Sequence, residues 1–253
     1  MILVDGGLGT ALQARGLPVG VAADTWVWDH PDEVAAVHRV FVDAGARIVL
    51  TATFRTLPDR EPRWEEHVDR AVALAASAGA AVWGSLGPCT EPGRGPLPDD
   101  DASVAAIAER LWSHDAVTGL VIESIMNLDE GVAMVAAVAR LERRNGPIVA
   151  SVAPTRAGRT YDGTALLEAF RRLTSAGADV VGYNCGDGVR GALAAVTVAR
   201  RWPRPVWAKP GALPGEDPMP ALEAAVDGNS GWIGGCCGVS SDHLRALSLH
   251  VGG

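Results

Sequence analysis

Short apolar runs recur along the whole chain, and each is followed by a segment with the pattern of a helix. Eight runs end in glycine or a small polar residue. They span residues 2–7, 47–53, 80–87, 119–125, 147–152, 179–185, 205–211 and 231–237. Because the runs are nearly continuous and do not alternate with polar residues, they are typical of parallel strands that are buried on both faces.

The segments between the runs carry helix signals. In residues 30–46, acidic residues occupy the first turn and Gly45 closes the end. Prolines restrict the helix expected within residues 212–229 to its second half. Further helices are predicted over residues 65–78, 103–112, 129–144, 163–175, 189–201 and 240–250.

Eight strand–helix units in about 250 residues match the size of a closed (β/α)8 barrel, the TIM barrel of the α/β class. We expect residues 1–253 to form this single domain, with a doubly wound open sheet as the alternative. The Pro- and Gly-rich loop 87–101 is a candidate lid.

Composition narrows the class of protein. The formal net charge of −8 disfavours nucleic acid and a polybasic membrane surface as partners, and the apolar fraction of 48% is enough for a large core. We find no leader-like start and no run of about 18 apolar residues, so we expect a cytoplasmic protein. A homo-oligomer is compatible with these features. The four cysteines are too few for a disulfide scaffold and are predicted to be thiols or metal ligands.

Polar residues at the carboxyl ends of the predicted strands are the candidates for chemistry, because the loops there form the catalytic face of such barrels. Cys185 ends the sixth run, and Cys236 and Cys237 end the eighth. Adjacent strand residues point to opposite faces, so Cys236 and Cys237 can share an ion only if the strand has already ended. Three thiolates with an open fourth position make a catalytic Zn²⁺ site. The alternatives are buried, inert cysteines, or a structural site completed by Cys89.

The ligand set favours one class of reaction. Three thiolates leave a Zn²⁺ site at a formal −1, which weakens its action on water but still favours the deprotonated form of a bound thiol. Negative charge also attracts a cationic methyl donor, either a sulfonium or a quaternary ammonium compound. Alkylation of a thiol is therefore favoured over hydrolysis.

Motifs along nearly the whole chain resemble the homocysteine S-methyltransferase family. They are Asp5-Gly6-Gly7, His38-x-x-Phe41-x-x-Ala44-Gly45-Ala46, Thr51-x-Thr53-Phe54, Gly84-Ser85-x-Gly87-Pro88, Glu123, Asn184-Cys185, Lys209-Pro210 and Gly234-Gly235-Cys236-Cys237-Gly238. The resemblance implies a zinc-dependent barrel whose metal is held by Cys185, Cys236 and Cys237, with homocysteine supplying the fourth sulfur.

The resemblance also implies that Asp5 and Glu123 bind the amino acid part of the substrate and that the Gly6 backbone approaches it closely. A carboxylate that faces an ammonium group forms a short, orienting hydrogen bond. We therefore predict Cys185, Cys236, Cys237 and Glu123 as catalytic residues.

Further candidates have both a functional and a structural interpretation. Thr53 and Ser85 either bind substrate or satisfy backbone groups at strand ends, and Asn184 is expected to orient the metal loop and to contact substrate. Lys209 either pairs with a carboxylate across the barrel mouth or binds substrate.

Three other features of the sequence bear on the site. His38 is expected to pack against the barrel. Trp26 or Trp28 either walls the pocket beside an onium methyl group or fills a gap in a loop. Ala52 replaces the asparagine that the family usually has between the two threonines of its TxTF motif.

We therefore expect a zinc-dependent thiol methyltransferase that converts homocysteine to methionine. S-methylmethionine, S-adenosylmethionine and betaine are the candidate donors, and selenohomocysteine or another small thiol is an alternative acceptor. The rival hypotheses are a non-catalytic homocysteine-binding homologue and a zinc hydrolase or deaminase.

Overall fold

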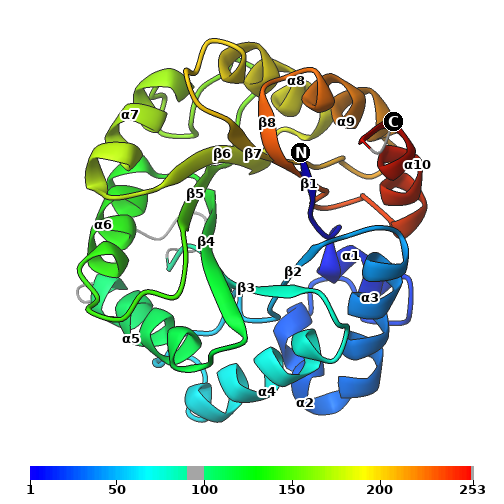
Figure 1. Cartoon of the computed structure of the whole chain (residues 1–253), viewed down its shortest axis with the longest axis vertical. Helices are drawn as coiled ribbons and strands as arrows, with labels where there is room; N and C mark the ends of the chain where they lie inside the picture. Colours follow the sequence, from blue (N-terminus) through cyan, green and yellow to red (C-terminus); the bar gives the residue numbers. More distant parts are fainter. Residues whose placement is uncertain (90–99, 252–253) are drawn as a thin grey trace.

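Eight parallel strands form a ring that is surrounded by helices in the computed structural model, which describes residues 1–89 and 100–251 (Figure 1). The strands are β1 (Ile2–Leu3), β2 (Ile48–Leu50), β3 (Ala81–Leu86), β4 (Val117–Ile125), β5 (Ile148–Val152), β6 (Val180–Cys185), β7 (Val206–Pro210) and β8 (Ser230–Ile233).

Helices follow the strands in turn along the chain. They are α1 (Leu8–Gln13), α2 (Trp26–Asp29), α3 (Pro31–Asp43), α4 (Trp64–Ala76), α5 (Asp100–Ser113), α6 (Leu128–Ala139), α7 (Leu166–Ala176), α8 (Gly188–Ala199), α9 (Met219–Val226) and α10 (Ser241–Val251), with a 3₁₀ turn at Ala23–Thr25. No helix in these ranges is long and apolar enough to cross a membrane.

The ring closes between the first two strands. The sheet runs in the order β1-β8-β7-β6-β5-β4-β3-β2, and a parallel bridge between Val4 and Ile48 joins its two ends. Backbone hydrogen bonds extend this joint, from Arg47 N to Leu3 O (2.8 Å) and from Asp5 N to Ile48 O (3.0 Å). The predicted (β/α)8 barrel is confirmed, and the doubly wound alternative is wrong.

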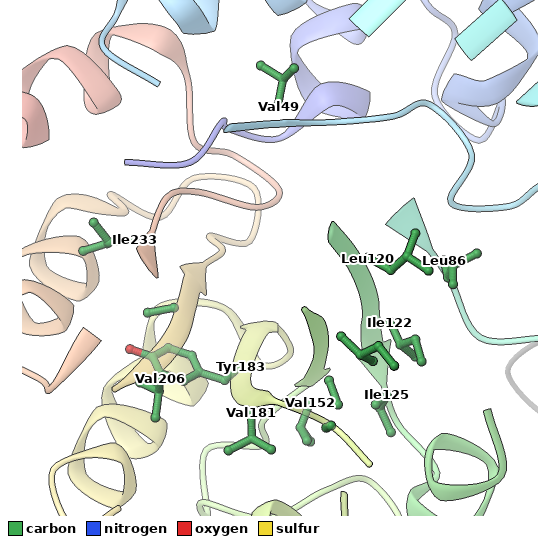
Figure 2. Close-up of a cluster of buried hydrophobic side chains, with 14 of the residues drawn as sticks. Val49, Leu86, Leu120, Ile122, Ile125, Val152, Val181, Tyr183, Val206 and Ile233 are labelled. Atoms are coloured by element: carbon green, nitrogen blue, oxygen red, sulfur yellow. The ribbon is translucent and has the colours of Figure 1, made fainter. Parts of the chain in front are cut away.

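Buried side chains lie on both faces of the strands, as the continuous apolar runs predict. Val49, Leu120 and Ile122 belong to the outer layer between strands and helices, part of which Figure 2 shows. The rings of Trp83 and Trp207 stack with their centroids 5.5 Å apart in a separate cluster. This second cluster fills the barrel interior.

Element boundaries differ from the predictions mainly at the carboxyl ends. The first and last strands end at Leu3 and Ile233, several residues before the apolar runs do, because residues 4–7 and 234–237 form the loops of the site. The predicted helix 129–144 ends at Ala139. The amide of Asn145 then donates to the carbonyl of Trp112 (2.8 Å), which holds the chain in a turn. Most of the candidate lid, 87–101, lies outside the described residues.

His38 in α3 is fully buried, as expected for a packing residue. Neither of its ring nitrogens has a hydrogen-bond partner within the described part of the chain. Burial lowers the pKa of His38 to about 4, although the charge of Asp5 opposes this effect. The imidazole is therefore neutral in the folded protein at neutral pH.

The buried His38 predicts a loss of stability in acid. An unfolded histidine has a pKa of about 6.5, so the unfolded state binds more protons as the pH falls below that value. The free energy of unfolding should fall by about 3 kcal/mol between pH 7 and pH 4 on account of this side chain. Urea unfolding of His38→Leu should show a shallower pH dependence, whereas the exposed control His250→Leu should keep the wild-type slope. Equal slopes for all three proteins would contradict the assignment.

Candidate active site

Three cysteines meet at the carboxyl ends of β6 and β8. The Sγ atoms of Cys185, Cys236 and Cys237 all lie within 4.8 Å of one another, and those of Cys185 and Cys236 are 3.1 Å apart. Cys236 and Cys237 follow the end of β8 and lie in irregular backbone. The sequence predicts that they can share an ion only in such a position. The group could hold a metal ion.

The end of β7 brings the two loops together. Cys185 pairs in register with Pro210, and the carbonyl of Pro210 accepts a hydrogen bond from Cys236 N (2.9 Å). Ala212 N donates to the carbonyl of Cys237 (2.8 Å). Cys185 has a φ of 53°, which turns its side chain out of the regular strand direction. Sulfurs that are 51 or more residues apart in sequence are thereby placed next to each other.

The three sulfurs of the cysteine group differ in protonation, and hydrogen bonds to Cys236 and Cys237 raise the pKa of Cys185 well above its ordinary value. Hydrogen bonds from Cys185 and then Cys236 lower the pKa of Cys237 to about 3, so one thiolate is already favoured among the three sulfurs. Soft thiolates are the ligands that zinc prefers in Cys-rich sites, and three of them leave one position open. Cys89 is fully buried and does not belong to the group, so it is not the fourth ligand. Instead its backbone N–H donates to Glu130 Oε1 (2.9 Å).

A cavity of about 330 Å³ opens beside the three sulfurs. This volume lies in the range of sites for small molecules. The polar and charged side chains that line it are Asp5, Thr10, Asp24, Thr51, Arg55, Ser85, Glu123, Ser124, Lys209 and the three cysteines. Its apolar wall includes Leu50, Ala52 and Phe54.

Two hydrogen-bonded pairs of polar and charged side chains line the cavity. Ser85 Oγ donates to Glu123 Oε1 (2.5 Å), and Lys209 Nζ donates to Asp5 Oδ1 (2.6 Å). Burial raises the pKa of Glu123 to about 7, although the positive charge of Lys209 opposes the shift. Burial alone would lower the pKa of Lys209, but the charges of Asp5 and Glu123 raise it. Lys209 therefore pairs with a carboxylate across the barrel mouth, which is one of the two roles that the sequence left open.

Asn184 connects β6 to β4, to β5 and to the loop after β8 that carries Cys236. Its Oδ1 accepts hydrogen bonds from Ser151 Oγ (2.7 Å) and Ser124 N (2.9 Å). Its Nδ2 donates to Ser124 Oγ (2.8 Å) and to Cys236 Sγ (3.7 Å). Asn184 is fully buried and does not line the cavity, so its contact with the site is through Cys236.

Thr53 and Gly6 shape the cavity in different ways. Thr53 Oγ1 donates to the carbonyl of Ser85 (2.7 Å) and lies 2.7 Å from Thr51 Oγ1, so its hydroxyl holds Ser85 and does not line the cavity. Gly6 lines the cavity, and a Cβ there would lie 2.6 Å from Cε1 of Phe41. A larger residue at position 6 would push apart the first loop and α3.

The two tryptophans of the first connection lie outside the cavity lining. Trp28 Nε1 donates to His67 Nδ1 (3.1 Å), and the Arg63 guanidinium lies 3.9 Å from the Trp28 ring centroid. Trp26 is buried, with its ring 4.3 Å from that of His30. Both tryptophans pack between helices, so the interpretation as a wall of the pocket is wrong.

Sequence reasoning missed four polar residues that line the cavity, Thr10, Asp24, Arg55 and Ser124. Ser124 has a φ of 61°, and Asp24 accepts a hydrogen bond from Arg55 N (2.7 Å). A left-handed backbone conformation at a serine cannot be read from the sequence. Asp24 lies in the connection between β1 and β2 and does not follow the end of a strand, where the candidates are expected. Only the folded arrangement reveals them.

Comparison with known proteins assigns the chain to a family. A family model described as homocysteine S-methyltransferase matches residues 2–251. The chain belongs to this family. The match confirms the resemblance seen in the motifs and the expected class of enzyme, a methyltransferase that acts on homocysteine.

Individual members of the homocysteine S-methyltransferase family are distant from this chain. An S-methylmethionine–homocysteine S-methyltransferase BHMT2 from Pongo abelii is 24% identical over 98% of the chain and 77% of its own length. A methionine synthase from Mycobacterium tuberculosis is 25% identical over 98% of the chain and 24% of its own length. The metallated form of the homocysteine methyltransferase MmuM from Escherichia coli has a TM-score of 0.82 at 22% identity, covering 99% of this chain and 96% of that one. The last comparison shows the same fold.

The hydrogen bonds of Asn184 predict its contribution to stability. Asn184→Ala leaves the Ser151 hydroxyl and the Ser124 N–H unpaired in a buried site, which should lower the free energy of unfolding by roughly 2–3 kcal/mol. Ser151→Ala removes one donor only and should cost about 1 kcal/mol. Urea unfolding of the metal-free proteins measures both values. An equal loss in the two variants would show that Asn184 does not organise this site.

Proposed function

We propose that the chain methylates homocysteine to methionine at a zinc ion held by Cys185, Cys236 and Cys237, with a small onium compound as the methyl donor. The observation that supports this most is the group of three cysteine sulfurs in the wall of a cavity that also contains Glu123. Three thiolates leave room for a fourth sulfur, and homocysteine carries one. Zinc bound there would supply a Lewis-acidic position that keeps a substrate thiol in its thiolate form.

The protein side chains would bind and orient the acceptor. Glu123 lies where a carboxylate could receive the substrate ammonium group, and Ser85 fixes its Oε1 by a hydrogen bond. Asp5 lines the same part of the cavity. The apolar wall at Leu50, Ala52 and Phe54 would limit the access of water to the reacting atoms.

The transfer itself needs only the acceptor and the donor. The homocysteine sulfur forms a bond to the methyl carbon, and the bond from that carbon to the positively charged sulfur or nitrogen of the donor breaks. The donor leaves as a neutral thioether or amine, and the thiol proton passes to solvent. The negative charge of the three thiolates would draw the cationic donor toward the acceptor.

The metal assignment predicts a zinc content that depends on the cysteine group. Protein purified with zinc should contain about one ion per chain. Cys236→Ser should lose most of this zinc, because an alcohol is a poor zinc ligand beside thiolates. Cys89→Ser is the matched control, and it should retain the metal. Elemental analysis after gel filtration measures the ratio, and loss of zinc from both variants would contradict the ligand set.

The activity predicts methionine formation from homocysteine by the zinc-loaded protein. S-methylmethionine, S-adenosylmethionine and betaine should be screened with chromatographic detection of methionine, and at least one should support turnover that Cys236→Ser lacks. Homocysteine binding in calorimetry without turnover with any onium donor would indicate a non-catalytic binding protein. A folded protein that binds neither zinc nor homocysteine would end the proposal.

A further inference from the structure

Lys209 is the only lysine in the chain. The other 21 of the 22 basic residues are arginines. An ammonium group is compact and has three donors that can point in different directions, whereas guanidinium is a wide planar fork. The single lysine side chain of the chain lies in the lining of the cavity, whereas all the remaining basic side chains are guanidinium groups.

The ammonium of Lys209 is buried and has donors to spare. Its side chain is 4% exposed, and Asp5 Oδ1 is its only hydrogen-bond partner in the described ranges 1–89 and 100–251. An ammonium carries three N–H donors, so two remain. Burying a charged donor without acceptors is costly, and Lys209 lines the cavity, where a ligand could supply them.

Both carboxylate oxygens of Asp5 already accept hydrogen bonds from the protein. Its Oδ1 accepts from Lys209 Nζ at 2.6 Å, and its Oδ2 accepts from Leu50 N at 2.8 Å. Both oxygens thus have strong donors before any substrate arrives. Asp5 is better placed to position the ammonium of Lys209 than to receive the ammonium of a substrate.

Of the two carboxyl groups whose charges act on Lys209, Asp5 and Glu123, only Glu123 has an oxygen without a hydrogen bond in the described residues. Its Oε1 accepts from Ser85, and its Oε2 has no hydrogen-bond partner among the residues that the structure describes. Next to the three sulfurs, the cavity therefore offers one buried ammonium, at Lys209, and one carboxyl group with an open oxygen, at Glu123. A zwitterionic amino acid has the complementary pair of charges.

The reach of homocysteine fits this pair. Its Cα is three bonds from the sulfur, so the two atoms are at most about 4.5 Å apart. The α-carboxylate must then lie close to the three cysteines. Lys209 pairs in register with Asn184, which itself donates to Cys236 Sγ, whereas Arg55 is an exposed residue of the cavity lining.

We propose that Lys209 binds the α-carboxylate of the thiol substrate and, together with the ammonium-binding role proposed above for Glu123, selects a zwitterionic amino acid. Asp5 acts through Lys209 as a positioning residue. This inference rests on the proposed function, because it assumes that a thiol reaches the three cysteines.

Truncated acceptors test the assignment. 3-Aminopropane-1-thiol is homocysteine without the carboxylate, and 4-sulfanylbutanoate is homocysteine without the ammonium group. Calorimetric binding to the zinc-loaded protein without donor gives the affinity for each thiol, and steady-state assays give kcat and KM separately. Lys209→Met should weaken homocysteine binding by roughly 10- to 100-fold and leave 3-aminopropane-1-thiol binding almost unchanged.

Two further variants sharpen the pattern. Glu123→Gln should show the mirror image, with weaker homocysteine binding and little change for 4-sulfanylbutanoate. Lys209→Arg keeps the charge and should retain part of the preference for a carboxylate. If Lys209→Met folds poorly because Asp5 is left unpaired, the double variant D5N/K209M removes both charges together and should show the same lost preference for a carboxylate.

The possible outcomes separate the two proposals. The assignment of Lys209 is wrong if Lys209→Met weakens the binding of homocysteine and of 3-aminopropane-1-thiol by the same factor. It is also wrong if Arg55→Met, and not Lys209→Met, abolishes the preference for a carboxylate. If the wild-type protein binds no thiol and forms no methionine, the proposed function itself fails. Wild-type turnover together with an unchanged preference in Lys209→Met would overturn the inference on Lys209 alone.

Discussion

The attachment of two loops to the end of one strand is the constraint on which the active site depends. Cys185 pairs with Pro210, and Cys236 N donates to the Pro210 carbonyl, so the loops after β6 and β8 meet beside β7. Neither loop could place a sulfur correctly alone, because each cysteine lies where regular strand geometry has ended. The barrel supplies the rigid strands, and these few backbone bonds bring the three sulfurs together.

Charge in the cavity is balanced around this sulfur group. The Asp5 carboxylate and the Cys237 thiolate are negative, burial raises the pKa of Glu123 to about 7, and Lys209 is the buried cation among them. Lys209 is paired with Asp5, whereas Glu123 has no cationic hydrogen-bond partner in the described residues. The pocket therefore has an ammonium group at one place and an open carboxyl oxygen at another. A net negative group next to a fixed ammonium suits an acceptor that carries both signs and a donor that carries a positive one.

The sequence was sufficient for the parts of the structure that follow from periodicity and from residue chemistry. Continuous apolar runs such as 147–152 predicted the strands, and the three cysteines predicted a shared site, because thiol chemistry leaves few other uses for this spacing. The interpretation of Trp28 as a wall of the pocket was wrong because its hydrogen-bond partner, His67, lies on α4, which is distant in sequence. The role of Lys209 stayed open for the same reason: Asp5 lies 204 positions earlier.

The arrangement of the cysteines requires unfavourable backbone conformations, which lower the stability of the fold. Ser124 and Cys185 both have a positive φ, of 61° and 53°, and such non-glycine conformations cost of order 1 kcal/mol or more each. Both strained residues are adjacent to Asn184, one in sequence and one through hydrogen bonds with its Oδ1 and Nδ2. Two bonds of this buried amide hold Ser124 in its turn, and its Nδ2 also donates to Cys236 Sγ. One side chain thus joins a strained turn to a cysteine of the site, which explains why a polar residue occupies a fully buried position in this barrel.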